Sequence, residues 1–298
     1  MGQSLPRYKE EPKKTELDLF SKKDSNPGTF DSYSLETNTI LDVKSFDGFV
    51  FELNHSLNQQ FSIGHTLSLG SFQQPPSYSL QAAFRDNNIS LVGNIDDKGL
   101  LCGHILAQLS AQLTFQTAFK IAQNDREIFS SGIATLEYFG SDSTGKIEVR
   151  SNNALICSYY QKITKKLNIG TRFTHFQKEK SNAVMLIARY QTDKTISTFS
   201  YSDFLNYIAL SYVHKISSRI GFASEIVYSL RDHSSFTSLG IKYSMRKTSF
   251  QTRFTSRNEI ASSLDLEFPM VSLGFSAKLD YKTHKYFAGI RVKIGPRI

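Results

Sequence analysis

Apolar and polar side chains alternate along most of this chain. In residues 271–281, and again in residues 286–294, every second side chain is Val, Leu, Ile, Phe, Tyr or Ala, and most of the side chains between them are small or charged. The same period of two begins near Phe46 and is interrupted by short polar turn sequences such as Asp86–Asn88 and Ser151–Asn153. This pattern predicts many β-strands, each with one apolar and one polar face.

Dividing the chain at its turn sequences gives about 19 strands between Phe46 and Ile294, each about 13 residues long with its turn. Residues 128–149 and 183–201 can be divided in more than one way. A strand that crosses a membrane at a tilt needs about 9–11 residues. The spacing therefore fits a transmembrane β-barrel.

Alternation alone also fits a soluble sandwich of two packed sheets. Here, however, the apolar face is almost free of charge in segment after segment, and Gly, Ser, Thr and Gln are common on the polar face. No proline occurs from Ser77 to Phe268, as expected where both edges of every strand are hydrogen-bonded. These features favour an all-β membrane barrel over a soluble β-rich binding or structural protein.

The composition excludes other classes. Only 40% of the 298 residues are hydrophobic, and the longest stretch without charge, Gly99–Phe119, is rich in Gln, Ser and Thr, which excludes membrane-spanning helices. The 23 Phe and 14 Tyr exclude a disordered chain. The net charge of +8 favours an anionic neighbour, and Cys102 and Cys157 indicate isolated thiols in a reducing compartment.

Three regions follow from these patterns. Residues 1–25 mix basic and acidic side chains with very few apolar ones, which predicts a mobile, charged N-terminal tail. Residues 26–45 begin with a turn sequence and carry apolar side chains at spacings that predict one short helix, ending near Asp42. Residues 46–298 are predicted to form the barrel.

The polar face of the strands would line the lumen of the barrel. The acidic candidates for contact with a positively charged passenger are Glu52, Glu137, Glu148, Glu225, Asp265 and Glu267. Because Lys and Arg residues also occupy this face, a solvated wall of mixed charge is the simpler interpretation. Weak, salt-sensitive attraction at several carboxylates would let a passenger bind and leave again.

Motifs that would indicate an enzyme are incomplete. Gly140–Lys146 resembles a phosphate-binding loop, but Ile147 stands where Ser or Thr would hold Mg²⁺, and a strand pattern follows. A hairpin turn is therefore predicted there. The seven histidines show no metal-ligand spacing, and no nucleophile motif is present, so we expect no catalytic residue, metal or cofactor, and no enzymatic activity.

One histidine occupies an unexpected position. His65 falls on the apolar face, between Ile63 and Leu67. It could mark a protein contact, a barrel-closing position or a β-bulge.

Several segments resemble the central channel subunit of the TOM complex, the protein-import pore of the mitochondrial outer membrane. They are Asn26–Phe30, Phe46–Asn54, Leu57–Ser71 and Leu136–Asp142. That family belongs to the mitochondrial porin superfamily, and the resemblance extends from Asn26 to Gly295. It implies a 19-stranded barrel, with the first and last strands paired in parallel and the short helix in the pore.

The resemblance also implies a function. Members of this family pass unfolded precursor proteins with basic presequences through the lumen, without hydrolysing ATP. They work as homo-oligomers within a complex that contains small subunits and receptor subunits, in the lipid bilayer of the mitochondrial outer membrane or the equivalent membrane of a related organelle. Both termini would face the intermembrane space, and nucleic acid is not expected as a partner.

The family's C-terminal insertion signal has the form polar-x-Gly-x-x-hydrophobic-x-hydrophobic. Here Gly289, Val292 and Ile294 match its glycine and its two hydrophobic positions, whereas Phe287 stands in the polar position. The resemblance thus assigns the signal to the last strand, with one departure.

A metabolite or ion porin of the same superfamily is the alternative. Such a porin has an amphipathic helix close to its N-terminus and a basic wall that selects anions. In this chain residues 1–25 precede the predicted helix, and carboxylates are spread over the predicted lumen face. These two differences favour the protein-conducting channel and predict preference for cations.

Overall fold

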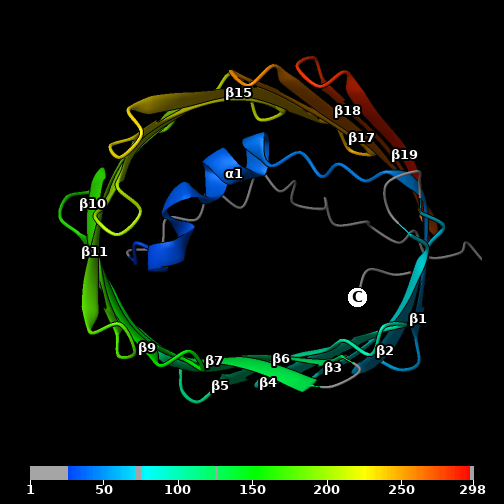
Figure 1. The fold of residues 1–298 in the computed structure, drawn as a ribbon, viewed down its shortest axis with the longest axis horizontal. Helices are drawn as coiled ribbons and strands as arrows, with labels where there is room; N and C mark the ends of the chain where they lie inside the picture. Colours follow the sequence, from blue (N-terminus) through cyan, green and yellow to red (C-terminus); the bar gives the residue numbers. More distant parts are fainter. Residues whose placement is uncertain (1–25, 71–74, 125–126, 296–298) are drawn as a thin grey trace, which may run out of the picture.

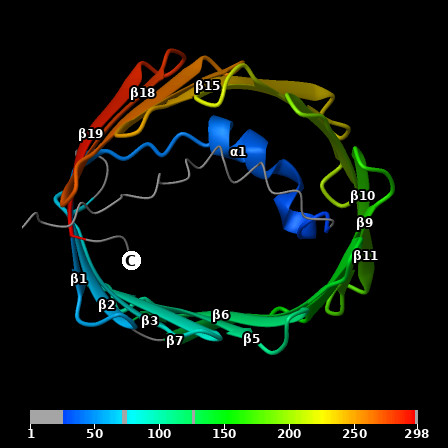
Figure 2. The same ribbon diagram turned by 180° about the vertical axis from the view of Figure 1, so that it is seen from behind.

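The computed structural model describes residues 26–70, 75–124 and 127–295. They form one closed barrel of 19 strands with a short helical segment inside it (Figures 1 and 2). Residues 1–25, predicted to be a mobile tail, lie outside the described residues.

The helical segment consists of a 3-10 turn, η2 (Phe30–Ser34), and α1 (Leu35–Leu41). The strands in chain order are β1 (Gly48–Ser56), β2 (Phe61–Ser68), β3 (Ser77–Arg85), β4 (Ile89–Asp96), β5 (Leu101–Gln108), β6 (Leu113–Asn124), β7 (Glu127–Phe139), β8 (Ser143–Arg150), β9 (Ala154–Lys162), β10 (Leu167–Phe176), β11 (Ser181–Gln191), β12 (Thr195–Ser202), β13 (Tyr207–Lys215), β14 (Ile220–Ser229), β15 (Ser234–Ser244), β16 (Thr248–Thr255), β17 (Glu259–Glu267), β18 (Val271–Asp280) and β19 (Lys285–Ile294).

Each strand pairs antiparallel with its neighbours in the sequence, except at the closure. There β1 and β19 pair in parallel, from Gly48 opposite Gly289 to Leu53 opposite Ile294. The strand number and the parallel closure are confirmed. Because the sheet closes on itself, none of the 19 strands in the described residues has an unpaired edge, which is the condition for a strand surrounded by lipid.

The alternating pattern separates an apolar exterior from a lumen face. In β9 the odd-numbered side chains Leu155 and Tyr159 are exposed on the outside, whereas Ala154, Ile156 and Tyr160 are buried inside. Of these inner side chains, Tyr160 packs against Phe30 of the helical segment. The two halves of the wall therefore differ, since one carries the helical segment and the other does not (Figure 1).

The short helix was predicted to end near Asp42, and Asp42 is its C-cap. Its start is less regular than the sequence indicates, because the first five residues form a 3-10 turn and Thr29 makes no side-chain capping bond. Within the described ranges, no helix has the length and apolar character needed to cross a membrane.

The run that resembles a phosphate-binding loop is a hairpin turn, as predicted. Strand β7 ends at Phe139 and β8 begins at Ser143, and the Gly140 N–H donates a hydrogen bond of 2.9 Å to the carbonyl oxygen of Ser143. Lys146 is a residue of β8 and points into the lumen.

Candidate functional site

Residues 26–46, here called the pore segment, follow the inside of the barrel and are held at both ends. The Asn26 side-chain amide donates a hydrogen bond of 2.6 Å to the carbonyl oxygen of Gly140, in the β7–β8 turn. At the other end the Ser276 hydroxyl on β18 donates to the carbonyl oxygen of Phe46 at 2.6 Å. Between these anchors, η2 and α1 lie against the inner wall (Figures 1 and 2).

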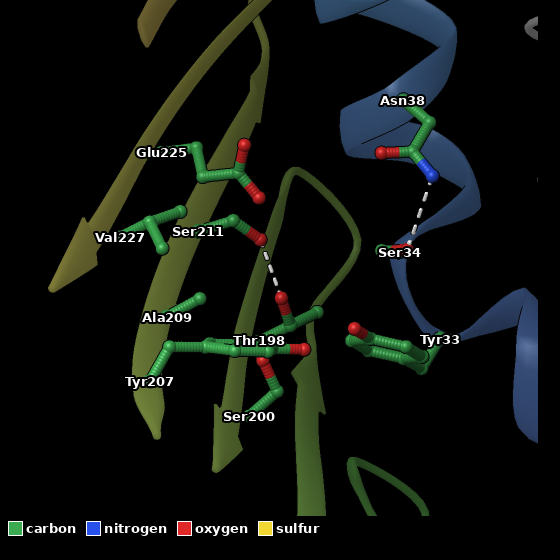
Figure 3. A pocket seen from close by; sticks show the side chains of 10 residues that line it. All are labelled: Tyr33, Ser34, Asn38, Thr198, Ser200, Tyr207, Ala209, Ser211, Glu225 and Val227. Atoms are coloured by element: carbon green, nitrogen blue, oxygen red, sulfur yellow. Dashed lines mark hydrogen bonds between the residues drawn. The ribbon is translucent and has the colours of Figure 1, made fainter. Parts of the chain in front are cut away.

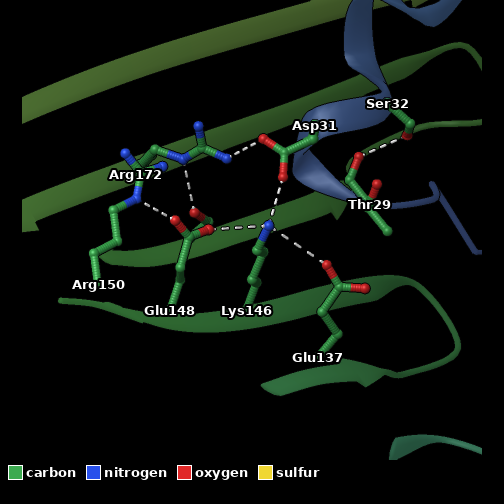
Figure 4. A network of polar contacts seen from close by, with 9 residues as sticks. Thr29, Asp31, Ser32, Glu137, Lys146, Glu148, Arg150 and Arg172 are labelled. Atoms are coloured by element: carbon green, nitrogen blue, oxygen red, sulfur yellow. Dashed lines mark hydrogen bonds and ion pairs between the residues drawn. The ribbon is translucent and has the colours of Figure 1, made fainter. Parts of the chain in front are cut away.

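Asp31 on η2 makes the first charged contact with the wall. Its carboxylate accepts a hydrogen bond from the Lys146 ammonium on β8 at 2.7 Å and another from the Arg172 guanidinium on β10 (Figure 4). The Arg172 guanidinium also lies 4.3 Å from the centre of the Phe30 ring, a cation–π contact.

Asp31 lies outside the membrane-spanning strands, and its pKa reflects these contacts. Burial alone would raise the pKa of the Asp31 carboxyl, but the hydrogen bonds and positive charges of Lys146 and Arg172 outweigh burial and hold the pKa below its ordinary value. The aspartate is therefore ionised at neutral pH, and the contact is a salt bridge.

Lys146 joins Asp31 to two of the predicted lumen carboxylates. Its ammonium is 3.2 Å from Glu148 and 3.7 Å from Glu137. Glu148 also accepts a hydrogen bond of 2.5 Å from Arg150. Figure 4 shows all these groups converging on the same part of the lumen. Two of the acidic candidates therefore lie here, each with a basic partner, and their contact with a passenger stays a prediction.

A buried ion pair fixes the middle of the pore segment. Glu36 accepts a hydrogen bond from Arg189 on β11, and both side chains are less than a tenth exposed. The same guanidinium donates to the carbonyl oxygen of Ser32 at 3.1 Å and to Gln191 at 2.9 Å. Because a buried charge without its partner is costly, this pair determines where the segment can lie.

Apolar contacts hold the end of α1. Ile40 and Leu41 are buried in one cluster with wall residues Ile196, Val213 and Ala223. Two inward-facing glycines permit the close approach: a Cβ at Gly221 would lie 2.9 Å from Ile40 Cδ1, and a Cβ at Gly240 would lie 2.7 Å from Leu41 Cδ2. The wall is therefore shaped to receive the helix.

Strand β16 satisfies the last carbonyl groups of α1. The Gln251 amide donates to the carbonyl oxygen of Ile40 at 2.8 Å, and Arg253 donates to that of Leu41 at 3.2 Å. These carbonyls have no partner within the helix, and a cation at a helix C-terminus is favourable. The wall thus completes a helix too short to be stable alone.

The other acidic candidates also face the lumen. Glu52 is 3.4 Å from Lys293, directly opposite it across the β1–β19 pair, and Asp265 accepts a hydrogen bond of 2.9 Å from Arg291. Glu267 lies on the inner face of β17. Glu225 on β14 has no hydrogen bond or ion pair with any described residue, unlike the four candidates above that have a basic partner.

The wall opposite the pore segment carries little charge. Across β2–β5 the inward positions are mainly Ser, Thr, Gln, Asn and small apolar residues, and the charged ones are Arg85 and Asp96, both at strand ends. Charge is therefore concentrated on one side of the lumen, around the pore segment and the β1–β19 closure.

The sequence pattern gave no indication that Asp31 and Glu36 form ion pairs with basic residues of the wall. For Glu137 a signal was present: hairpin register places it directly opposite Lys146. Inward positions of opposite charge on adjacent strands would have indicated that pair before the structure was known.

His65 faces outward on β2, where its Nδ1 lies 2.7 Å from the hydroxyl of Tyr78 on β3. Pairing is continuous through His65, with Leu53 on one side and Leu80 on the other, so the β-bulge interpretation is wrong. A role in a protein contact or in closure stays a prediction. The closure itself lies one strand away, between β1 and β19.

The predicted insertion signal lies in β19. Val292 and Ile294 face outward, next to Phe51 and Leu53 of β1. Gly289 faces inward, where a Cβ would lie 2.3 Å from the carbonyl oxygen of Phe46. The glycine is thus required by packing against the pore segment, and its role in a signal stays a prediction.

A closed barrel with an apolar exterior, a polar lumen and a helical segment docked inside it defines a β-barrel channel protein. The chain belongs to the eukaryotic porin family, whose sequence profile matches residues 26–289. The matched region includes the pore segment, strands β1–β18 and the first half of β19.

Individual relatives align with this chain over most of its length. It is 27% identical over 281 residues to the probable mitochondrial import receptor subunit TOM40-2 of Arabidopsis thaliana, covering 89% of each chain. It is 23% identical over 289 residues to the mitochondrial import receptor subunit TOM40 homolog of Mus musculus, covering 91% of this chain and 78% of the relative. The TOM40 homolog 2 of Drosophila melanogaster is 24% identical, covering 98% of this chain and 89% of the relative.

Proposed function

We propose that this protein is the protein-conducting channel of the mitochondrial outer membrane, or of the equivalent membrane in a related organelle. The observation that carries the proposal is similarity to import receptor subunits along almost the whole chain, 89% of it for the Arabidopsis thaliana relative. The passenger is an unfolded precursor protein with a basic presequence, and it crosses through the barrel lumen.

The lumen offers such a passenger weak and distributed attraction. Its carboxylates lie at separate places: Glu137 and Glu148 beside the start of the pore segment, Glu225 beside α1, and Asp265 and Glu52 near the closure. Most of them already have a basic partner, so a basic passenger exchanges one ion pair for another. Exchange of this kind costs little at each step and leaves no deep energy minimum in which a passenger would stay.

The proposed role includes partners but no enzymatic step. The channel works within a translocase that contains receptor subunits and small subunits, as a homo-oligomer in the lipid bilayer. The subunit hydrolyses no ATP and needs no cofactor.

Single-channel recording of the refolded barrel tests the proposal. We expect a reversal potential that shows preference for cations in a salt gradient, and block by a basic presequence peptide that weakens as salt rises. A peptide of equal length with its Lys and Arg replaced by Gln is the matched control and should not block. Extraction with alkaline carbonate is a separate check, since release of the protein would exclude a membrane barrel.

A metabolite porin of the same family is the second candidate, and a specific feature favours it. Four cations of the inner wall, Lys146, Arg172, Arg189 and Arg253, lie beneath the pore segment. Preference for anions together with no block by the presequence peptide would establish this alternative.

A further inference from the structure

A cavity of about 280 Å³ lies between the pore segment and the lumen face of the wall. Tyr33, Ser34 and Asn38 line it from η2 and α1. Strands β12, β13 and β14 contribute the opposite side, with Thr198, Ser200, Tyr207, Ala209, Ser211, Glu225 and Val227. Its volume is close to the lower limit of small-molecule pockets, about 300 Å³, so it suits one small group rather than a large ligand.

Most polar groups around the cavity already have partners. The Ser211 hydroxyl lies 2.9 Å from that of Thr37 and is also hydrogen-bonded to Thr198. The Asn38 amide donates to the Ser34 hydroxyl at 3.2 Å. Figure 3 shows the Ser211–Thr198 and Asn38–Ser34 bonds and the Glu225 carboxylate facing the helix across the open space.

Glu225 is the exception. It is half-buried, and among the described residues its side chain has no hydrogen bond or ion pair, only the longer-range charge of Arg253. The positive charge of Arg253 acts on it from a distance, but that guanidinium donates its hydrogen bond to Leu41. A half-buried carboxylate without a close counter-charge favours any cation that can reach it.

The aromatic residues that line the cavity indicate which kind of cation would bind. Tyr33 and Tyr207 place two phenol rings at one end of the cavity (Figure 3). Aromatic faces attract ammonium groups and cover alkyl chains, and an ammonium has three N–H donors for the carboxylate and nearby hydroxyls. We propose that this cavity is a binding site for a primary alkylammonium group, with Glu225 as its counter-ion.

Two sources have this chemistry: a free alkylamine and the side chain of a lysine in a chain that occupies the lumen. The site requires only the barrel and its docked pore segment, so it does not rest on the passage of precursor proteins. If the site fails, block by a presequence peptide is unaffected, and the two hypotheses can fail separately.

Binding of n-butylammonium to the refolded full-length barrel in neutral detergent is the test, measured by ligand-observed saturation-transfer NMR. We expect saturable binding to the wild type and none of n-butanol, the neutral analogue. Glu225→Gln should weaken binding by about fivefold or more, which corresponds to about 1 kcal/mol for one partly solvated ion pair. Ala209→Leu fills the cavity without changing charge and should weaken binding as well.

Glu259→Gln is the matched control. Glu259 also faces the lumen, but it is paired with Lys278 at 3.3 Å and lies outside the cavity. This variant should bind butylammonium as the wild type does. Equal weakening in Glu225→Gln and Glu259→Gln, or full affinity in Ala209→Leu, would overturn the site, provided that far-UV circular dichroism shows each variant folded.

A blocked tripeptide with a central lysine distinguishes the two sources. If it displaces butylammonium and its norleucine analogue does not, the site accepts a protein side chain. If neither displaces it, the site is restricted to free amines.

Discussion

Asp265 and Arg291 form a salt bridge of 2.9 Å although a whole strand lies between them. Asp265 belongs to β17 and Arg291 to β19, and both face Gly274 of β18 in the register of the sheet. The bridge passes over the bare backbone of this glycine. Because Gly274 has no side chain, the bridge can link β17 to β19 across β18, next to the closure.

A side chain at Gly274 should break this bridge. A Cβ there would lie 2.9 Å from Asp265 Oδ1 and 3.2 Å from Arg291 Nε. We expect Gly274→Val to lower the free energy of unfolding by about 1–3 kcal/mol, measured by urea denaturation in detergent, because the new side chain is overpacked. Gly145→Val is the control, since a Cβ at Gly145 has no neighbour within 4 Å. Equal destabilisation by both variants would show that the bridge is irrelevant.

Loss of Arg189 should release the middle of the pore segment. Arg189→Met leaves the buried Glu36 carboxylate without its partner, at a cost of about 3–5 kcal/mol. Hydrogen exchange of residues 35–41 should become much faster. The double variant Glu36→Gln with Arg189→Met should recover most of the protection, because it removes both charges.

The partly exposed pair Lys278–Glu259 is the control for this experiment. It has the same chemistry, but each side chain is 29% exposed, so Lys278→Met should change stability by less than about 1 kcal/mol. Fast exchange in the double variant as in Arg189→Met would contradict the role of the buried pair.

Acid should loosen the start of the pore segment at Asp31. The pKa of Asp31 is lower in the folded protein than its ordinary value of 3.8, so the folded state binds fewer protons than the unfolded state. The stabilisation is complete above the ordinary pKa and is lost as the pH falls through the lower folded value. We expect hydrogen-exchange protection of residues 30–34 to be constant from pH 7 to about 5 and to fall below about pH 4.

Asp31→Asn separates this titration from that of other groups. Among the residues that the structure describes, Glu137, Glu148 and Arg150 lie near Asp31 in addition to Lys146 and Arg172. The variant should show weak protection already at pH 7 and little further change on acidification. Loss of protection in the wild type between pH 7 and 5 would assign the effect to another group.

A side chain at Gly240 should displace the end of α1. Its Cβ would lie 2.7 Å from Leu41 Cδ2 and 3.2 Å from the carbonyl oxygen of Ile40. Gly240→Val should therefore increase proteolysis within the pore segment and change single-channel conductance. Gly93→Val, where a Cβ has no neighbour within 4 Å, should change neither. Unchanged proteolysis in Gly240→Val would show that the wall adapts to the larger residue.

The barrel could be predicted from the sequence because the alternation that marks a membrane strand depends only on neighbouring residues in the chain. A strand exposes alternate residues to lipid and to the lumen, so residues 271–281 reveal both faces without knowledge of any neighbour. Turn sequences then give a strand number of about 19, and only residues 128–149 and 183–201 can be divided in more than one way. The parallel pairing of β1 with β19 joins the two ends of the barrel, and only resemblance to a family indicated it.

The docking of the pore segment could not be predicted in the same way. Asn26 and Gly140, or Glu36 and Arg189, are more than 100 positions apart, and no periodicity relates them. Glu36 resembles a solvated residue of a short polar helix, yet it is buried. The Asp265–Arg291 bridge depends on the register of three strands and on the missing side chain of Gly274. Such contacts follow from the closed shape, which exists only after the whole sheet is assembled.

With 19 strands, β1 and β19 run in the same direction, so both end at the same rim of the barrel. Strand β7 also ends at this rim, and the turn that follows it holds Asn26. The chain therefore enters the lumen at the rim where β19 ends, whichever way the barrel faces in the membrane. Asn26 and Ile294 therefore face the same compartment. One partner in that compartment can contact both the start of the pore segment and the end of β19.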